Sequence, residues 1–100
     1  MESAVAFGRV LRRLRKRIGL TQEELGFEAD LRRTFVSLLE LGQQQPSLTT
    51  ILKLATVLKT RPGELMDLVE QEIREFSGGG KTDGAQDYES RGPFDPQKFD

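Results

Sequence analysis

The stretch from Leu20 to Gly42 constrains the fold most, because it predicts two short helices joined by a tight turn. Thr21 precedes Glu24 by three residues, which is the spacing of a capping box between a threonine hydroxyl, a glutamate carboxylate and two backbone N–H groups. Asp30 marks the turn, because aspartate is one of the few residues besides glycine that tolerate the left-handed conformation. Two helices separated by so short a turn cross steeply, so one of them projects.

The second helix of this pair is predicted to run from about Arg32 to Leu41. Val36 and Leu39 fall on its buried side, and Gly42 follows as the residue that ends it. Arg32 stands where a capping Ser or Thr is more usual, so this helix is expected to begin with a weaker cap.

Three further helices are predicted by apolar residues that recur every three or four positions. The first runs from about Ser3 or Ala4 to Gly19, the fourth follows Ser47 as its N-cap, and the fifth begins near Pro62. Their apolar stripes are Phe7, Val10, Leu11, Leu14 and Ile18; then Leu48, Ile51, Leu52, Ala55 and Leu58, broadened by Leu54 and Val57; then Leu65, Met66, Leu68, Val69, Ile73 and Phe76. The sequence therefore predicts an all-α domain of five helices over residues 1–76.

The composition excludes several classes of protein. The chain has 100 residues, of which 36% are apolar and 31% charged, as expected for one small soluble helical domain. We expect no membrane segment and a cytoplasmic location, because no apolar run approaches the length of a spanning helix and no signal peptide is seen. The sequence contains neither cysteine nor histidine, which removes thiolate chemistry and the commonest metal ligand and general base. We therefore expect no enzyme, no metal and no cofactor.

The net charge of −1 conceals an uneven distribution of charge. Residues 77–100 contain five acidic and three basic residues, so the segment before them is slightly positive. The positive charge is concentrated in the first helix, at Arg9, Arg12, Arg13, Arg15, Lys16 and Arg17. For Arg12, Arg13 and Lys16 we expect an ordinary solvated face.

In this order and at these spacings, several motifs together resemble the Cro and lambda-repressor helix-turn-helix proteins, often called the Xre family. The motifs are Leu20-Thr21-Gln22-Glu23-Glu24-Leu25, Arg33-Thr34-Phe35-Val36-Ser37, Glu40 with Gly42, and Pro46-Ser47-Leu48 before a helix with Leu54 and Ala55. The match extends from about Val10 to Met66. The resemblance implies a lambda-repressor-like fold and a sequence-specific transcriptional regulator, more often a repressor, that binds double-stranded DNA.

The resemblance also implies which residues face DNA. They are Gln22, Arg32, Arg33, Thr34, Ser37 and Leu38, with Gln43 and Gln44 lying along the DNA backbone. Arg33 is expected to read a guanine, because a guanidinium matches the O6 and N7 acceptors of that base. Gln22 is expected to bond a phosphate at the N-terminus of its helix. Phe35 is left open between covering the edge of the core and stacking on the DNA backbone.

A structural ion pair is a further implication of the resemblance. In family members the residue at the position of Arg15 pairs with the one at the position of Glu40, and both are present here. We therefore expect a partly buried, bidentate pair that ties the first helix to the recognition helix.

The end of the fifth helix carries apolar residues past the point where the family's domain is usually complete. Val69, Ile73 and Phe76 either lie back against the first helix, on Val5 and Phe7, or form a homodimer contact. We favour the dimer, because a small chain rarely leaves three large apolar residues in water and because this fold commonly reads two-fold operators.

Two further expectations complete the reading. Residues 77–100 contain three successive glycines at positions 78–80 and show no apolar period, so they are predicted to be a disordered tail. An alternative function also stays open, in which Phe27, Phe35, Leu38 and Leu41 form an exposed apolar patch that binds a partner protein. An antitoxin that binds both a toxin and its own operator would combine the two functions.

Overall fold

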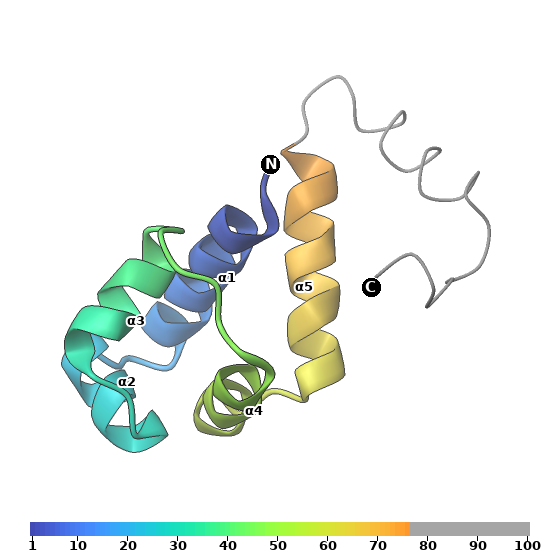
Figure 1. Cartoon of the computed structure of the whole chain (residues 1–100). Helices are drawn as coiled ribbons and strands as arrows, with labels where there is room; N and C mark the ends of the chain where they lie inside the picture. The colour runs from blue at the N-terminus through green and yellow to red at the C-terminus, as the bar shows by residue number, and fades with distance from the viewer. Residues whose placement is uncertain (77–100) are drawn as a thin grey trace.

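The structure is a computed structural model that describes residues 1–76, in which five α-helices form one bundle (Figure 1). The helices are α1 (Ser3–Arg17), α2 (Gln22–Ala29), α3 (Arg33–Glu40), α4 (Leu48–Val57) and α5 (Pro62–Glu75). The all-α, five-helix fold predicted from the sequence is confirmed within these residues. None of these five helices combines the length and the apolar character needed to cross a membrane. The tail predicted for residues 77–100 lies outside the described residues.

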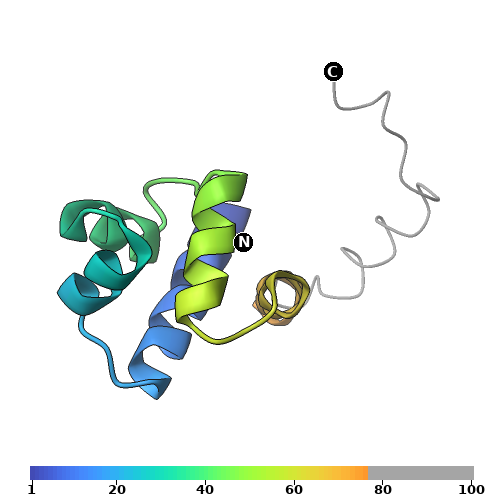
Figure 2. The ribbon, with the colours of Figure 1, turned by 90° about the horizontal axis from the view of Figure 1, so that it is seen from below.

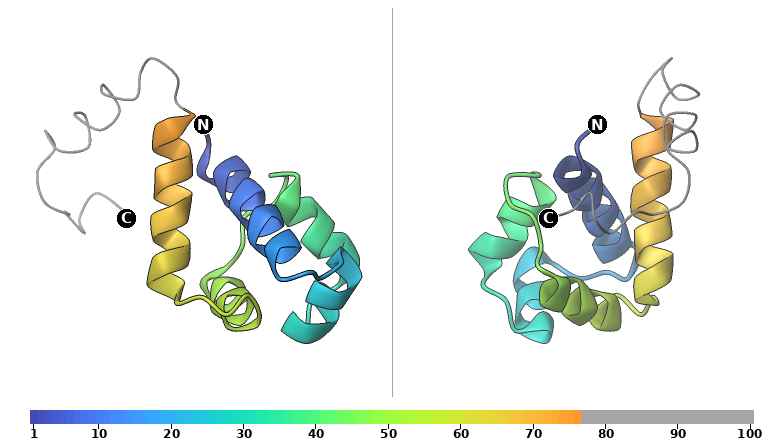
Figure 3. Two further views of the ribbon diagram at one scale, coloured as in Figure 1. Left: turned by 180° about the vertical axis from the view of Figure 1, so that it is seen from behind. Right: turned by 45° about the vertical axis from the view of Figure 1, so that its right-hand side comes forward.

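Helix α1 occupies the centre of the arrangement. Helices α2 and α3 lie on one side of it and α5 on the other, whereas α4 contacts both α2 and α5 (Figures 1 and 2). Seen from behind, α1 runs from beside the end of α5 to the beginning of α2 (Figure 3). Helix α3 packs on α1 and α2, and the opposite side of α3 faces away from the domain.

The core receives apolar side chains from all five helices. Its largest fully buried members are Leu11, Leu25, Leu39, Leu54, Leu65, Val10 and Val36. Burying one such side chain contributes about 1.5–3 kcal/mol to folding. The apolar stripe predicted for the first helix is buried as expected at Phe7, Val10, Leu11 and Leu14.

Local signals in the sequence set the helix ends. Thr21 and Glu24 form the predicted capping box, with the Thr21 hydroxyl accepting from the Glu24 N–H at 3.0 Å and the Glu24 carboxylate accepting from the Thr21 N–H at 2.9 Å. Asp30 adopts the left-handed conformation at φ 57°, and the Ser47 side chain caps α4. These predictions are confirmed because each depends on residues within one turn.

Three predicted helix boundaries are wrong by one or two residues. Helix α1 ends at Arg17 rather than at Gly19, because Gly19 has φ 80° and reverses the chain after the helix. Helix α3 is one residue shorter at each end than predicted, with Arg32 as an N-cap that makes no side-chain hydrogen bond. The weak cap expected there is therefore present.

The buried face of α4 differs from the prediction. Leu48 and Leu52 are 72% and 46% exposed, whereas Leu54, Ala55 and Leu58 are buried. Apolar residues cover most of the circumference of this helix, so the pattern alone does not select the side that meets α2 and α5. Packing against those two helices determines which side of α4 is buried.

The expectation that the end of α5 finds no packing partner in its own domain is wrong for Val69. Val69 is buried at 8% exposure, because α5 lies back against α1. Ile73 is partly buried against the same core, and Phe76 remains 54% exposed. The alternative in which α5 folds onto α1 therefore accounts for most of this stripe.

A buried carboxylate fastens α5 to α1. Glu72 is only 3% exposed, and its Oε1 accepts from Arg13 at 2.8 Å, while Arg9 lies 3.8 Å from its Oε2 and 5.3 Å from the ring centre of Phe76. Arg13 is solvent-exposed, as expected, but it also pairs with a buried charge on the neighbouring helix, which was not predicted.

Candidate nucleic-acid interface

The first turn of α3 presents its side chains to solvent. Arg32, Arg33 and Thr34 are all exposed, whereas Ser37 and Leu38 are partly buried one turn further on. The five residues that the sequence analysis placed on this helix therefore lie on or beside its outward face. Among residues 1–76, no segment covers Arg33 or Thr34, and both are open to solvent.

The inner side of α3 is held against α1 at very short range. Val36 and Leu39 are fully buried beneath it. A Cβ atom at Gly8 would lie 2.3 Å from the carbonyl oxygen of Leu39 and 2.6 Å from that of Glu40, so only a glycine permits this approach. The backbone of α3 therefore rests directly on the backbone of α1.

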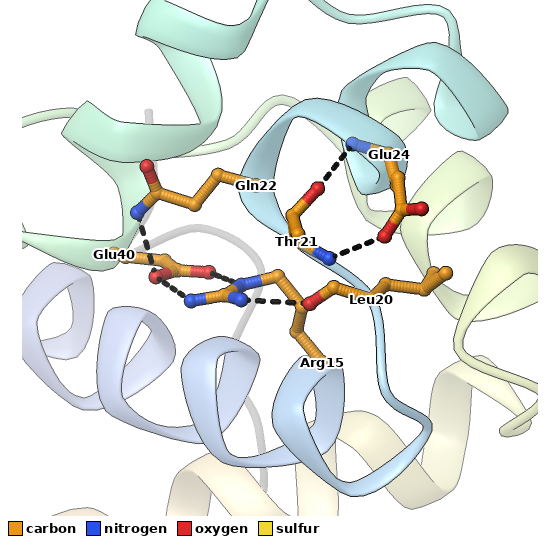
Figure 4. Close-up of polar contacts among 6 residues, drawn as sticks. All are labelled: Arg15, Leu20, Thr21, Gln22, Glu24 and Glu40. Carbon is orange, nitrogen blue, oxygen red and sulfur yellow. Dashed lines mark hydrogen bonds and ion pairs between the residues drawn. The ribbon is translucent and has the colours of Figure 1, made fainter.

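An ion pair reinforces the same junction (Figure 4). The Arg15 guanidinium donates to Glu40 through Nε at 2.5 Å and Nη2 at 3.0 Å, and its Nη1 donates to the carbonyl of Leu20 at 2.8 Å. The two side chains are 9% and 4% exposed, so the predicted bidentate pair is present and largely buried. The hydrogen bond to Glu40 raises the pKa of Arg15, whereas burial lowers it. The hydrogen bond is the larger effect, so the guanidinium stays charged in the folded protein.

The N-terminus of α2 lies beside the same cluster. The Gln22 side chain donates through Nε2 to Oε1 of Glu40 at 3.0 Å, and its carbonyl oxygen points away from Glu40 (Figure 4). An open depression of about 370 Å³ is lined by Arg15, Thr21, Gln22, Glu23 and Arg33. The structure thus brings Gln22 and Arg33, which are distant in sequence, to the rim of one surface feature.

The remaining predicted positions are placed as follows. Gln43 and Gln44 are exposed in the loop after α3, which begins at Gly42 with φ 76°. Phe35 is partly buried and packs on the core, so of its two readings the structure favours covering the core edge. In the proposed apolar patch, Phe27 and Leu41 are 84% and 63% exposed, whereas Phe35 and Leu38 are partly buried.

The sequence analysis did not single out Gly8 or Gly26. A Cβ at Gly26 would lie 2.6 Å from the carbonyl oxygen of Leu31, so this glycine lets the turn between α2 and α3 fold back closely. A signal was available for both, because a glycine inside a helix lowers its stability and commonly marks a close backbone approach.

These observations define the class of protein. A short helix, a tight turn at a left-handed residue and a second short helix with an exposed, basic first turn are the parts of a helix-turn-helix domain. In this class the second helix enters the major groove of DNA and its N-terminal residues meet the base edges.

Comparisons with known proteins agree with this class. The helix-turn-helix family matches residues 11–65. Control protein C.BamHI of Bacillus amyloliquefaciens is 39% identical over 62 residues, which cover 61% of this chain and 76% of that protein. The restriction-modification controller protein C.AhdI from Aeromonas hydrophila is 50% identical, with a TM-score of 0.60 over 62% of this chain and 94% of its own. The clp gene regulator ClgR from Corynebacterium glutamicum shares the fold, at 20% identity and a TM-score of 0.75 over 94% of this chain and 98% of its own.

The chain therefore belongs to the helix-turn-helix family. The matched segment begins within α1 and ends within α5, so it contains every residue of α2 and α3. The family resemblance inferred from the sequence motifs is confirmed.

Proposed function

We propose that this protein is a sequence-specific transcriptional regulator that lays α3 in the major groove of duplex DNA. The exposed first turn of α3, with Arg33 and Thr34 facing outward beside Gln22 of α2, carries this proposal. A helix N-terminus and a guanidinium at the rim of one depression suit a phosphate and a base edge respectively.

Each exposed side chain has a role that its chemistry permits. Arg33 offers two parallel N–H donors to a guanine, and Thr34 offers a methyl group to thymine or a hydroxyl to phosphate. Leu38 is limited to apolar contact. Gln43 and Gln44 are neutral donors to the DNA backbone, so the salt dependence of binding is expected to be shallower than with lysines in that loop.

The relatives indicate the kind of regulator. Two of them are named as control or controller proteins, one of restriction-modification, and they are 39% and 50% identical to this chain over 61% and 62% of its length. We propose the same role here, in which the protein occupies an operator that overlaps a promoter and thereby blocks transcription. No catalytic step is needed for such an action.

We propose that the regulator binds a palindromic operator as a homodimer. Two observations support this: Leu48 and Leu52, one turn apart on α4, are exposed, and Met66, also exposed, lines a shallow apolar groove between α1, α4 and α5. A second copy of the chain would cover it and hold two recognition helices about one DNA turn apart. The dimer contact predicted from the sequence at the end of α5 is the competing location. It would involve Ile73 and Phe76 alone, since Val69 is already buried within the domain.

Selection from random duplexes tests the DNA-binding proposal. The purified protein should enrich a palindromic sequence at low salt, and Arg33→Ala should lower affinity by about 1–3 kcal/mol and relax the preference at one base pair per half-site. Arg12→Ala is the matched control, because it removes the same charge from an exposed position on α1 and should leave the preference intact. A selection that enriches no sequence would contradict the proposal and favour the protein-binding alternative.

Sedimentation at micromolar concentration tests the dimer and its location. Leu52→Asp should give a monomer, whereas Phe76→Asp should remain dimeric. The reverse result would move the contact to the end of α5. If the unmodified protein sediments as a monomer both alone and on its operator, the homodimer is wrong.

A further inference from the structure

The carboxylate of Glu40 links three helices through hydrogen bonds. Glu40 is the last residue of α3, and it accepts hydrogen bonds from Arg15 of α1 and from Gln22 of α2. Its Oε1 accepts from both partners, at 3.0 Å in each case. The first residue of α3 is Arg33, which lies seven residues, or about 10 Å of helix, from Glu40.

The hydrogen bond to Glu40 uses one donor of the Gln22 amide and leaves its other hydrogen-bonding groups available. A glutamine amide has two N–H donors and one carbonyl acceptor, and here one N–H is committed to Glu40. The second N–H of the amide remains available to a ligand, as do the backbone N–H groups of Gln22 and Glu23, which begin α2 and have no acceptor within that helix. The bond to Glu40 sets the direction of the amide N–H, and the helix N-terminus adds its partial positive charge for an anion nearby.

We propose that Glu40 is a positioning residue for DNA recognition. It acts through Gln22: by fixing the amide, it fixes where one DNA phosphate is held relative to the first turn of α3. The inference rests on the proposed function, because it requires that Gln22 meets a phosphate and Arg33 a base. Glu40 then sets where the phosphate held by Gln22 lies relative to the base read by Arg33, and it also neutralises Arg15.

The burial of the cluster explains why the orientation is retained. The Glu40 side chain is 4% exposed, so water competes poorly for its oxygens, and the buried guanidinium of Arg15 holds the carboxylate from the other side. A hydrogen bond to a charged acceptor is also stronger than one between neutral groups. A free glutamine at the first turn of a helix would instead sample several rotamers before meeting DNA.

An operator with single methylphosphonate substitutions provides the test, because each substitution removes the charge of one phosphate. The unmodified protein should lose about tenfold in affinity when the phosphate at Gln22 is neutralised, as expected for one charge-assisted hydrogen bond. Gln22→Ala keeps the backbone N–H donors and loses only the amide, so the loss at that phosphate should fall to about twofold to threefold. Glu40→Gln offers Gln22 a neutral acceptor in place of a charged one, so it should show part of the same reduction at that phosphate, while keeping the base preference that depends on Arg33.

Two further variants keep the test decisive. The double variant Arg15→Met with Glu40→Met removes the acceptor altogether without leaving a buried charge, and it should show the full reduction seen with Gln22→Ala. Thr34→Ala is the control, because it lies on the DNA face outside the cluster, and its effect should add to that of Glu40→Gln.

The outcomes separate the inference from the function on which it rests. If Gln22→Ala lowers the sensitivity at one phosphate and the Glu40 variants keep the full sensitivity there, the positioning role is wrong while DNA binding stands. A Glu40 variant that weakens all phosphate and base contacts equally would also overturn it, because that pattern indicates a purely structural role. If the unmodified protein selects no DNA sequence, the proposed function itself fails.

Discussion

Replacement of Gly8 by alanine should destabilise the domain by about 2 kcal/mol. The new Cβ would lie 2.3 Å from the Leu39 carbonyl oxygen and 2.9 Å from the carbonyl carbon of Glu40, whereas ordinary contact begins at 3.4 Å. Both are backbone atoms, which cannot rotate away, so α1 and α3 must separate by roughly 1 Å. Such overpacking costs about 1–3 kcal/mol or more. The gain in helix propensity from glycine to alanine, about 1 kcal/mol, offsets only part of that.

Thermal and urea unfolding followed by circular dichroism measure this effect. A loss of about 2 kcal/mol corresponds to a fall in Tm of roughly 8–16 °C for a domain of this size. Gly63→Ala is the matched control, because Gly63 lies in α5 with nothing within 4 Å of the added Cβ, and it should raise stability by about 0.5–1 kcal/mol. If Gly8→Ala is as stable as the parent, the two helices are not held at backbone contact and the reasoning about α3 is refuted.

Two further predictions concern stability and use the same unfolding measurements. Glu40→Met should cost about 3–5 kcal/mol, because Arg15 would be left buried without its partner, whereas Glu72→Met should cost less than about 1 kcal/mol, since the half-exposed Arg9 and Arg13 can return to water. Equal losses for the two would contradict this distinction. Lys59→Gly should stabilise the domain by about 0.5–1 kcal/mol, because Lys59 is held at φ 59° and relief of that strain exceeds the added entropy of the unfolded chain. A fall in Tm for this variant would contradict the prediction, because it would show that the exposed lysine side chain stabilises the domain.

The features predicted correctly from the sequence are those decided within one turn of chain or by a complete motif. The Thr21–Glu24 capping box and the left-handed Asp30 depend only on neighbouring residues. The Arg15–Glu40 pair joins residues 25 apart, and only the family resemblance, not local physics, identified it. The exposed first turn of α3 followed from the same resemblance.

The features that the sequence did not reveal are those decided between helices. Helix α4 is apolar on most sides, so its neighbours determine that Leu52 faces out and Leu54 faces in. On α5, Glu72 occupies an inward position between Val69 and Phe76, where an apolar side chain is expected. The pairing of that carboxylate with the arginines of α1 appears only once the two helices lie side by side.

The stability of α3 must come from its surroundings, and this explains where its exposed groups lie. A helix of eight residues is too short to be stable alone, and Arg32 gives it no side-chain cap. Burial of Val36 and Leu39, backbone contact at Gly8 and the ion pair of Glu40 all act on its inner side or its C-terminal end. Within residues 1–76, the side chains of Arg33 and Thr34 are therefore left without a hydrogen bond or ion pair that DNA would have to displace. A side-chain cap at position 32 would occupy one of the N–H groups that this turn offers to an anion.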